Sequence, residues 1–289
     1  LVSGVISRIK NNLRMRRGAP VLQPYYNIIK LCSKTEVVSD TASWIFRIAP
    51  FVVMSSSLTA LALVPAVISG NAVGSGSDFL AILFILSLGR FFLALAGIDA
   101  GSSVGGMGSS REMFISSFAE PCACLALFGL FLQTGSTNAA SLGYAAVQAP
   151  VSVVLGSICL IMVIIAETSR LPIDNQETHL ELTMVHEAMI LEYSGRGLAF
   201  VEIGSYLKQM IWFGVLAHIM FPVSVAASAG VVPVLTATAF FTVKILAIAW
   251  FVAFLEVLIA KMRLFRITDY FGFAAVFGLL AVISSFMGI

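Results

Sequence analysis

The sequence predicts an all-α integral membrane protein in which residues 1–289 form a single domain. Hydrophobic residues make up 59% of the chain and charged residues only 11%, and the mean hydropathy is +0.98. Apolar stretches of about 20 residues recur along the chain, which is the length that an α-helix needs to cross the hydrocarbon core of a bilayer. These two observations indicate a polytopic membrane protein in contact with lipid.

The remaining composition argues against several kinds of site. The net charge of +2 does not indicate a nucleic-acid partner, because the basic residues are distributed among loops and form no recognition surface. The four cysteines lack the paired spacing of a zinc or iron–sulfur site, and we interpret them as packing residues. The sequence has no P-loop, no GxGxxG and no HExxH motif. We therefore expect this chain to have no catalytic residue, no metal site and no cofactor of its own.

The first forty residues differ from the rest in polarity. Residues 1–7 are followed at once by five basic residues, an order opposite to that of a signal peptide. We interpret residues 1–7 as the cytoplasmic end of a first membrane helix whose beginning is absent from this sequence. The stretch 16–40 is too polar to span and too apolar for a solvated linker. It predicts an interfacial amphipathic helix opened by Pro20 or Pro24, with an ordinary cytoplasmic loop as the alternative.

Seven further membrane helices are predicted, which makes eight with the fragment at the start. Their approximate ranges are 46–69, 79–98, 112–133, 150–166, 206–228, 233–260 and 270–288. The stretch GSSVGGMGSS, residues 101–110, follows the second of these and is interpreted as a flexible turn.

The distribution of basic residues predicts the orientation of these helices. The connections GNAVGSGSD, TGSTNAASLGYAAVQAP and ASAGVVP contain no Lys or Arg, whereas every alternate connection contains at least one. The positive-inside rule assigns the basic connections to the cytoplasm. The longest of these is the cytoplasmic loop 167–205, and loops of that length usually carry function or structure of their own.

This long loop is acidic. Residues 166–195 hold six of the fifteen Asp and Glu residues of the chain. Asp174 and Glu177 match a capping box, which predicts a helix from Asn175 to about Glu192. On that helix the acids Asp174, Glu177, Glu181 and Glu192 fall within about 60° of one another, and His179 and His186 fall on the opposite side. Such a stripe is typical of a proton-handling or cation-facing surface, and a solvated acidic face is the alternative.

Charged residues also occur inside the apolar stretches. Each costs roughly 2.5–3.5 kcal/mol at the bilayer centre, and such residues usually face the bundle interior or a wet cavity. We expect either a chain of protonatable groups that continues the acidic stripe into the bilayer or interhelical ion pairs, with Glu120 or a loop acid as the partner of Lys244. The charged residues within or beside the spans are Arg90, Arg111, Glu112, Glu120, Lys244 and Glu256.

Several motifs in the same order resemble those of the complex I subunit 1 family. AE(x)2R(x)P(x)D, E(x)3E and EYSG resemble the signature loop of that family, RRGAPVLQPYYNIIKL its first cytoplasmic loop, and GSSREMFISSFAEP its third-to-fourth helix junction. The resemblance implies eight membrane helices, with carboxylates that lead from a docking surface into the membrane. It implies a docking-loop and proton-path role for Glu167, Arg170, Asp174, Glu177, Glu181, Glu187 and Glu192, and places Arg111, Glu112 and Glu120 at the helix junction.

One branch of the family is the most similar. The run THLELTMVHEAMILEYSG resembles the membrane subunit of group 4 nickel–iron hydrogenases. That resemblance implies a non-catalytic subunit of an oxidoreductase complex in the prokaryotic cytoplasmic membrane. Its partners would be a hydrogenase large subunit with a NiFe centre, a subunit with iron–sulfur clusters, and antiporter-like membrane subunits.

Two alternatives stay open. The first is the quinone-binding subunit of a complex I-like NADH or ferredoxin dehydrogenase. The chain has Pro172-Ile173-Asp174 and Gly18-Ala19-Pro20 where complex I members usually have other residues. Because of the departure in the first loop, at Gly18-Ala19-Pro20, quinone binding is not carried over. The second alternative is an autonomous proton or cation transporter, which the intramembrane charges favour.

Overall fold

The structure is a computed structural model that describes residues 1–39, 42–64, 78–138, 150–174, 184–221, 230–262 and 266–288. Its helices are α1 (Val2–Leu13), α2 (Gln23–Cys32), α3 (Trp44–Leu63), α4 (Phe79–Asp99), α5 (Ser103–Thr134), α7 (Pro150–Glu167), α8 (His186–Ile190), α9 (Gly195–Met220), α10 (Val231–Leu258) and α11 (Ile267–Met287).

The predicted all-α membrane fold is confirmed. Six described helices are long and apolar enough to cross a bilayer, namely α3, α4, α5, α7, α10 and α11. The helix α9 covers the described part of the predicted span 206–228 but is not among the six. It begins at Gly195, eleven residues earlier than predicted, and its first fourteen residues include Arg196, Glu202 and Lys208. This helix tolerates its polar residues because it packs inside the bundle, against α3, α7 and α10.

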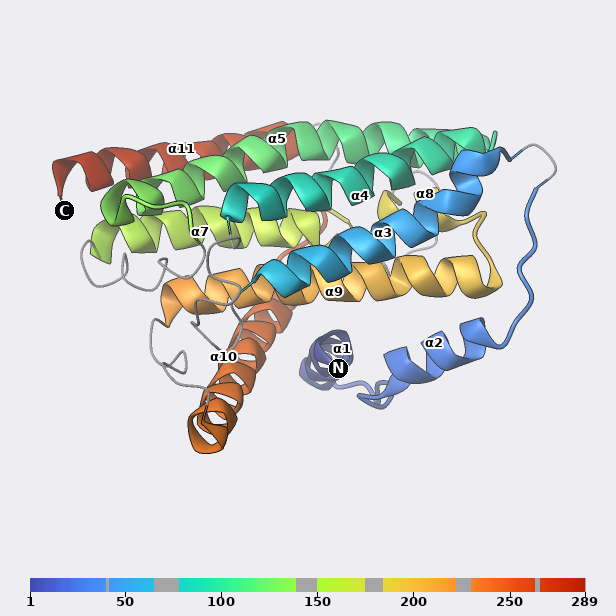
Figure 1. Ribbon diagram of the computed structural model, residues 1–289, viewed down its shortest axis with the longest axis horizontal. Coiled ribbons are helices and arrows are strands. Elements are labelled where there is room, and N and C mark those ends of the chain that lie inside the picture. The colour runs from blue at the N-terminus through green and yellow to red at the C-terminus, as the bar shows by residue number, and fades with distance from the viewer. Residues whose placement is uncertain are drawn as a thin grey trace.

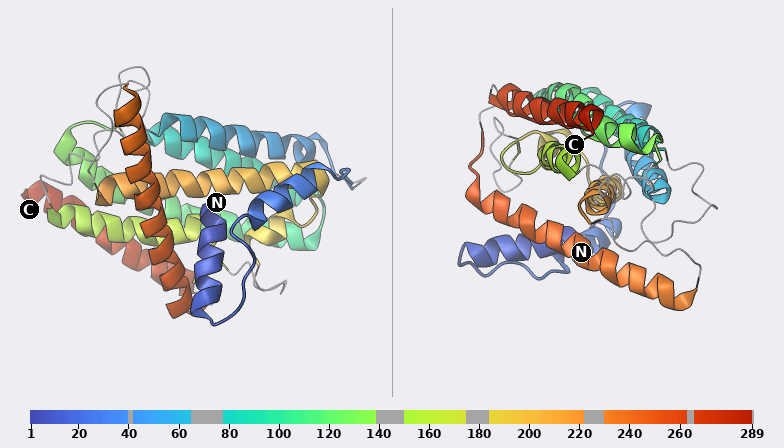
Figure 2. Two further views of the ribbon diagram at one scale, coloured as in Figure 1. Left: turned by 90° about the horizontal axis from the view of Figure 1, so that it is seen from below. Right: turned by 90° about the vertical axis from the view of Figure 1, so that its left-hand side faces the viewer.

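Most of the long helices run side by side, whereas α10 crosses the bundle obliquely (Figures 1 and 2). The helices α5, α7 and α11 pack against one another, and so do α3 and α4. The start of α3, the end of α4 and the starts of α5 and α9 lie at one end of the bundle, together with α8 (Figure 1). We call this the loop end, because α8 and the start of α9, which belong to the long loop 167–205, lie there.

The short helices α1 and α2 lie beside α10 and α9 respectively (Figure 2). The helix α1 continues past the predicted fragment 1–7 to Leu13. The amphipathic helix predicted after the basic segment is present as α2. Pro24 lies in its first turn, where the missing N–H of proline has little consequence. The apolar residues Leu22, Tyr25, Tyr26 and Ile29 are exposed. Its location at a membrane interface stays a prediction.

The glycine-rich segment 101–110 is not the flexible turn that the sequence predicted. All but its first two residues belong to α5, which is 32 residues long. A Cβ atom added at Gly105 would lie 2.6 Å from the carbonyl oxygen of Gly97, and one at Gly108 would lie 2.8 Å from the Cβ of Ala188. These glycines therefore let α5 approach α4 and α8 closely, so that the three elements pack together at the loop end.

The EYSG segment ties the start of α9 to residues far away in the sequence. The Tyr193 hydroxyl donates to the Phe46 carbonyl at 2.9 Å, and the two rings stack with centroids 4.1 Å apart. The Ser194 hydroxyl donates to the Val37 carbonyl at 2.9 Å and accepts from the Val37 amide at 2.8 Å. Gly195 has φ +51°, and a Cβ atom there would lie 2.7 Å from the Thr35 carbonyl oxygen. The segment therefore fixes the α2–α3 connection against the bundle.

Candidate functional site

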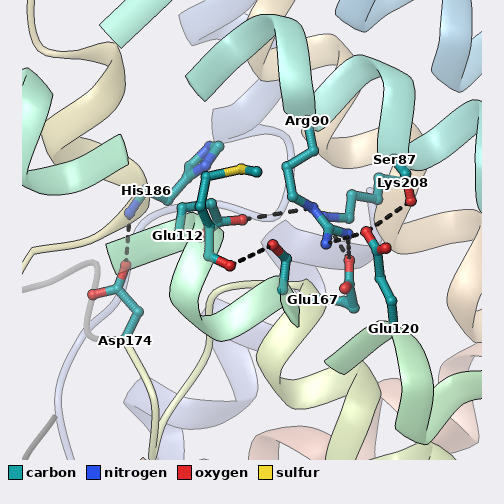
Figure 3. Close-up of polar contacts among 10 residues, drawn as sticks. Ser87, Arg90, Glu112, Glu120, Glu167, Asp174, His186 and Lys208 are labelled. Atoms are coloured by element: carbon teal, nitrogen blue, oxygen red, sulfur yellow. Dashed lines mark hydrogen bonds and ion pairs between the residues drawn. The ribbon is translucent and has the colours of Figure 1, made fainter. Parts of the chain in front are cut away.

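An arginine on α4 gathers carboxylates from two neighbouring helices (Figure 3). The guanidinium of Arg90 lies 3.0 Å from a Glu120 oxygen and 3.8 Å from a Glu112 oxygen, both on α5, and it donates to Glu167 at the end of α7. Only 7% of the Arg90 side chain is exposed. A buried guanidinium needs such partners, because an isolated charge in an apolar interior is strongly unfavourable.

A second cation joins this group from α9. The Nζ atom of Lys208 lies 2.8 Å from the same Glu167 oxygen that pairs with Arg90, and the Ser87 hydroxyl donates to Glu120 at 2.7 Å. We call Arg90, Glu112, Glu120, Glu167 and Lys208 the Arg90 cluster. It contains three carboxylates and two cations, so its formal charge is 2 − 3 = −1 when every group is ionised. One carboxylate can therefore take up a proton without leaving a cation unpaired.

A second group of charges surrounds Glu256, near the end of α10. One Glu256 oxygen lies 2.6 Å from Arg170, and the other lies 3.3 Å from the Nζ atom of Lys10 on α1. The Glu256 side chain is only 4% exposed. We call Lys10, Arg170 and Glu256 the Glu256 cluster. The cluster brings together three segments that are far apart in the sequence, namely α1, the α7–α8 connection and α10.

Asp174 is buried and holds the start of α8. Its Oδ2 atom accepts from the amides of Val185 and His186 at 3.3 and 3.1 Å, and its Oδ1 atom lies 3.7 Å from Lys261 (Figure 3 shows the contact to His186). Burial lowers the pKa of Lys261, while the Asp174 carboxylate acts in the opposite direction. The Met262 amide also donates to the Pro172 carbonyl at 2.9 Å. The connection after α7 is thus fixed both to α8 and to the end of α10.

A cavity of about 330 Å³ is lined by residues of both clusters and by parts of α1, α2, α3, α4, α5, α7, α8 and α9. We call it the central cavity. Its charged lining residues are Lys10, Arg90, Glu112, Glu167, Arg170 and Lys208. Hydroxyl and amide groups add to this lining, so the cavity is polar and roomy enough to hold water. Among the described residues, no three His, Cys, Asp or Glu side chains come together as a metal site would require.

The structure brings together most of the charged residues that the sequence singled out inside the spans. Arg90, Glu112, Glu120 and Glu167 form one cluster, and Glu256 forms the other with Arg170. Lys244 is apart from them, since it donates to the Phe221 carbonyl at 2.6 Å, at the end of α9. Glu120, which was one of the candidate partners of Lys244 beside the loop acids, pairs with Arg90 instead.

The acidic stripe that was predicted along one helix, from Asn175 to about Glu192, does not form. The helix α8 spans only His186–Ile190, so Asp174 and Glu192 do not lie on one continuous helix. Asp174 turns inward to the amides of α8, and Glu192 is exposed beyond its end. His186, expected to face away from the functional surface, lines the central cavity. Glu177, Glu181 and His179 lie outside the described residues.

Three other residues complete this description. Glu187 is half-buried in the first turn of α8. Arg111 donates to the Met184 carbonyl at 3.1 Å and so links α5 to the residues before α8. Sequence reasoning missed Lys208, although a lysine at the start of the predicted span 206–228 should have drawn attention to it.

Comparisons with known proteins show which family the chain resembles. A family model described as NADH dehydrogenase matches residues 2–286. Hydrogenase-4 component C of Escherichia coli is 30% identical over 269 residues, which cover 91% of this chain and 84% of that protein. Formate hydrogenlyase subunit 4 of Escherichia coli is 32% identical over 229 residues, which cover 77% of this chain and 73% of that protein.

A solved structure shares the fold. It is that of the membrane-bound sulfane sulfur reductase, an archaeal respiratory membrane complex, one chain of which superposes with a TM-score of 0.81 at 15% identity. The superposition covers 98% of this chain and 93% of that one. The family match over nearly the whole sequence and the identity to the two Escherichia coli proteins show that the chain belongs to the NADH dehydrogenase subunit 1 family.

Proposed function

We propose that this chain is the membrane-anchor and proton-coupling subunit of a membrane-bound nickel–iron hydrogenase complex. In this role it docks a hydrogenase large subunit and an iron–sulfur subunit at its loop end. It links their redox reaction to ion translocation through antiporter-like membrane subunits. Those partners carry the NiFe centre and the iron–sulfur clusters. The similarity to hydrogenase-4 component C and to formate hydrogenlyase subunit 4 supports this choice of complex.

The observation that carries the coupling role is the composition of the Arg90 cluster. Three carboxylates from α5 and α7 share two cations from α4 and α9, and all of these residues except Glu120 line the polar cavity. Interacting acids of this kind exchange protons as a group, because each protonation changes the field at the others. Glu112 and Glu167 line the cavity, whereas Glu120 lies on the far side of Arg90. The cluster can therefore exchange protons with water in the cavity through Glu112 and Glu167.

The choice of complex is tested by its partners. The native chain, purified from its own membranes in mild detergent, should retain a large subunit with cysteine-bound nickel and iron and a subunit with iron–sulfur clusters. Elemental analysis should find nickel and iron in that preparation, which should also oxidise hydrogen with an artificial dye. Co-purification of a flavin-containing NADH-oxidising module without nickel would contradict the proposal.

A second candidate function is supported by the central cavity itself. The quinone-binding subunit of a complex I-like dehydrogenase would need such a space, and several apolar side chains contribute to the lining, among them Ile6, Leu86 and Leu93. Solvent extraction of the purified complex distinguishes the two candidates. Quinone in a near-stoichiometric amount, with turnover that a quinone-site inhibitor blocks, would favour this second function over the first.

A further inference from the structure

The first 35 residues carry a charge opposite to that of the rest of the chain. They contain no Asp or Glu, so their formal side-chain charge is +7. The remaining residues hold 17 − 7 = 10 of the Lys and Arg residues and all 15 Asp and Glu residues, which gives 10 − 15 = −5. In the structure the first 35 residues comprise α1, a turn and α2, and we call them the α1–α2 unit. Its basic residues are Arg8, Lys10, Arg14, Arg16, Arg17, Lys30 and Lys34.

Close contacts hold the α1–α2 unit in one shape. The Arg8 guanidinium donates to the Gly18 carbonyl at 3.4 Å. Met15 adopts φ +56°, which turns the chain at the end of α1. A Cβ atom added at Gly4 would collide with the Val21 carbonyl oxygen, so the start of α1 lies directly against the segment before α2. The unit is therefore a folded surface and not a loose basic tail.

The helix α2 has two faces with different surroundings. One face lines the central cavity with Gln23, Pro24 and Asn27. On a helical projection, the exposed apolar residues form a stripe about 100° wide that faces the other way. Figure 1 shows α2 at the margin of the molecule, so this helix is a wall of the cavity with an apolar outer face. The residues of the apolar stripe are Leu22, Tyr25, Tyr26 and Ile29.

Exposed basic side chains flank the apolar stripe along the chain. Arg16 and Arg17 precede α2, and Lys30 and Lys34 lie at its end. Exposed aromatic and aliphatic residues bordered by Lys and Arg are characteristic of helices that lie in the headgroup region of a bilayer. The phosphate groups of anionic lipids neutralise the basic residues there, and the acyl chains cover the apolar ones.

The bilayer is within reach of the α1–α2 unit. The next helix along the chain, α3, is apolar and long enough to cross a membrane. It begins with Trp44, which is 65% exposed, and Arg47 is exposed one turn later. Trp and Arg at the end of a membrane helix usually lie at the level of the lipid headgroups. These residues favour a lipid over a protein as the partner of the segment that leads into α3.

We propose that the outer face of the α1–α2 unit binds anionic phospholipids of the adjacent leaflet. Arg16, Arg17, Lys30 and Lys34 bind the phosphate groups, and the apolar stripe of α2 packs against the acyl chains. Because the opposite face of α2 lines the central cavity, bound lipid also stabilises that wall of the cavity. This binding does not depend on which redox complex contains the chain.

A photo-reactive side chain in the apolar stripe tests which molecule covers it. Benzoylphenylalanine replaces Ile29, which is 67% exposed, in the native complex reconstituted into vesicles of phosphatidylcholine and phosphatidylglycerol in equal amounts. We expect illumination to give lipid adducts in which phosphatidylglycerol exceeds phosphatidylcholine severalfold. The control position is Phe286, 75% exposed near the end of α11, where the two lipids should react equally. A partner subunit as the main adduct, or equal amounts of both lipids at position 29, would overturn the proposal.

Charge variants measure the contribution of the basic residues. Phosphatidylglycerol added to the delipidated complex in mild detergent should raise its unfolding temperature, because a ligand of the folded state stabilises that state. Each basic residue near an anionic lipid surface strengthens binding about fivefold, so Arg16→Gln with Arg17→Gln should raise the lipid concentration needed by roughly twenty-fivefold. Arg196→Gln with Arg266→Gln removes the same charge from exposed positions elsewhere and should leave that concentration unchanged. An equal lipid requirement in all three proteins, or equal stabilisation by phosphatidylcholine, contradicts the proposed binding.

Discussion

Lys208 on α9 and Arg90 on α4 share a single oxygen of Glu167. The Lys208 side chain is 19% exposed and the Glu167 side chain 3%. Glu167 is therefore the point at which α4, α7 and α9 are held together by charge. Because a buried carboxylate is stable only with its cations in place, removing either partner should affect the other two residues.

The first prediction concerns the coupling between Lys208 and Glu167. Lys208→Met removes one of the two cations at Glu167, so the thermal stability of the purified complex should fall. In the double variant with Glu167→Gln, part of the loss should be recovered. A double-mutant cycle should give an interaction free energy of about 0.5–3 kcal/mol, as is usual for residues in contact. Strictly additive effects would show that the contact contributes nothing to stability.

The second prediction concerns the Glu256 cluster. Glu256→Gln leaves Lys10 and Arg170 without their shared carboxylate in a buried position, and breaking such a pair typically costs roughly 3–5 kcal/mol. We expect a marked loss of complex yield and a lower unfolding temperature. Replacing all three residues by apolar side chains of similar size should restore much of the stability. An unchanged unfolding temperature for Glu256→Gln would contradict the burial of this cluster.

The third prediction tests the EYSG segment. Gly195 adopts φ +51° beside the Thr35 carbonyl, so Gly195→Ala should destabilise the protein by roughly 1–3 kcal/mol. Gly106→Ala is the matched control, since it lies in α5 with nothing within 4 Å of the added Cβ atom. That substitution should be neutral or stabilising by about 0.4–1 kcal/mol. Thermal unfolding of both variants measures the difference, and equal values would argue against the close approach to Thr35.

The fourth prediction follows from the pKa of Glu202, which is raised by burial and by the Glu187 carboxylate. A carboxyl whose pKa is raised in the folded state binds a proton more tightly there than in the unfolded state. Its contribution to stability is fully present below the ordinary pKa of 4.5 and is lost as the pH rises through the folded-state pKa. Relative to Glu202→Gln, which does not titrate, the wild type should therefore lose stability between acidic and neutral pH. The groups that set this dependence are Glu187 and Tyr206. Parallel unfolding curves at every pH would contradict it.

The apolar helices were predictable because local sequence determines them. The predicted span 79–98 agrees with α4 to one residue, since an uninterrupted apolar run follows Asp78, whose side chain accepts from the Leu80 amide and caps the helix. The start of α5 was misplaced because glycines usually interrupt helices. Here Gly105 and Gly108 are required by the neighbours of α5, which sequence periodicity does not reveal.

Most of the charged residues of the site could be predicted from the sequence, but the ion pairs that they form could not. Charges are rare inside apolar spans, so Arg90, Glu120 and Glu256 could be named from sequence alone, whereas Lys208 at the start of its span was missed. Which of them meet depends on how α4, α5 and α7 pack. The prediction of the acidic stripe was wrong for a related reason, because the projection assumed one continuous helix. In the structure Asp174 accepts from the amides of Val185 and His186, eleven and twelve residues away, at the start of the short helix α8.

Glu112 offers the most direct test of proton coupling. It lines the central cavity, its side chain is 13% exposed, and its contact with Arg90 is the longest in the cluster at 3.8 Å, so Glu112→Gln should disturb the fold least. Proton uptake per electron pair should be measured in inverted vesicles that carry the native complex, with Asp269→Asn, at an exposed position, as the control. Uptake should fall severalfold in Glu112→Gln while assembly and the control stay normal. Wild-type uptake in a fully assembled Glu112→Gln complex would contradict the proposal that the Arg90 cluster carries protons.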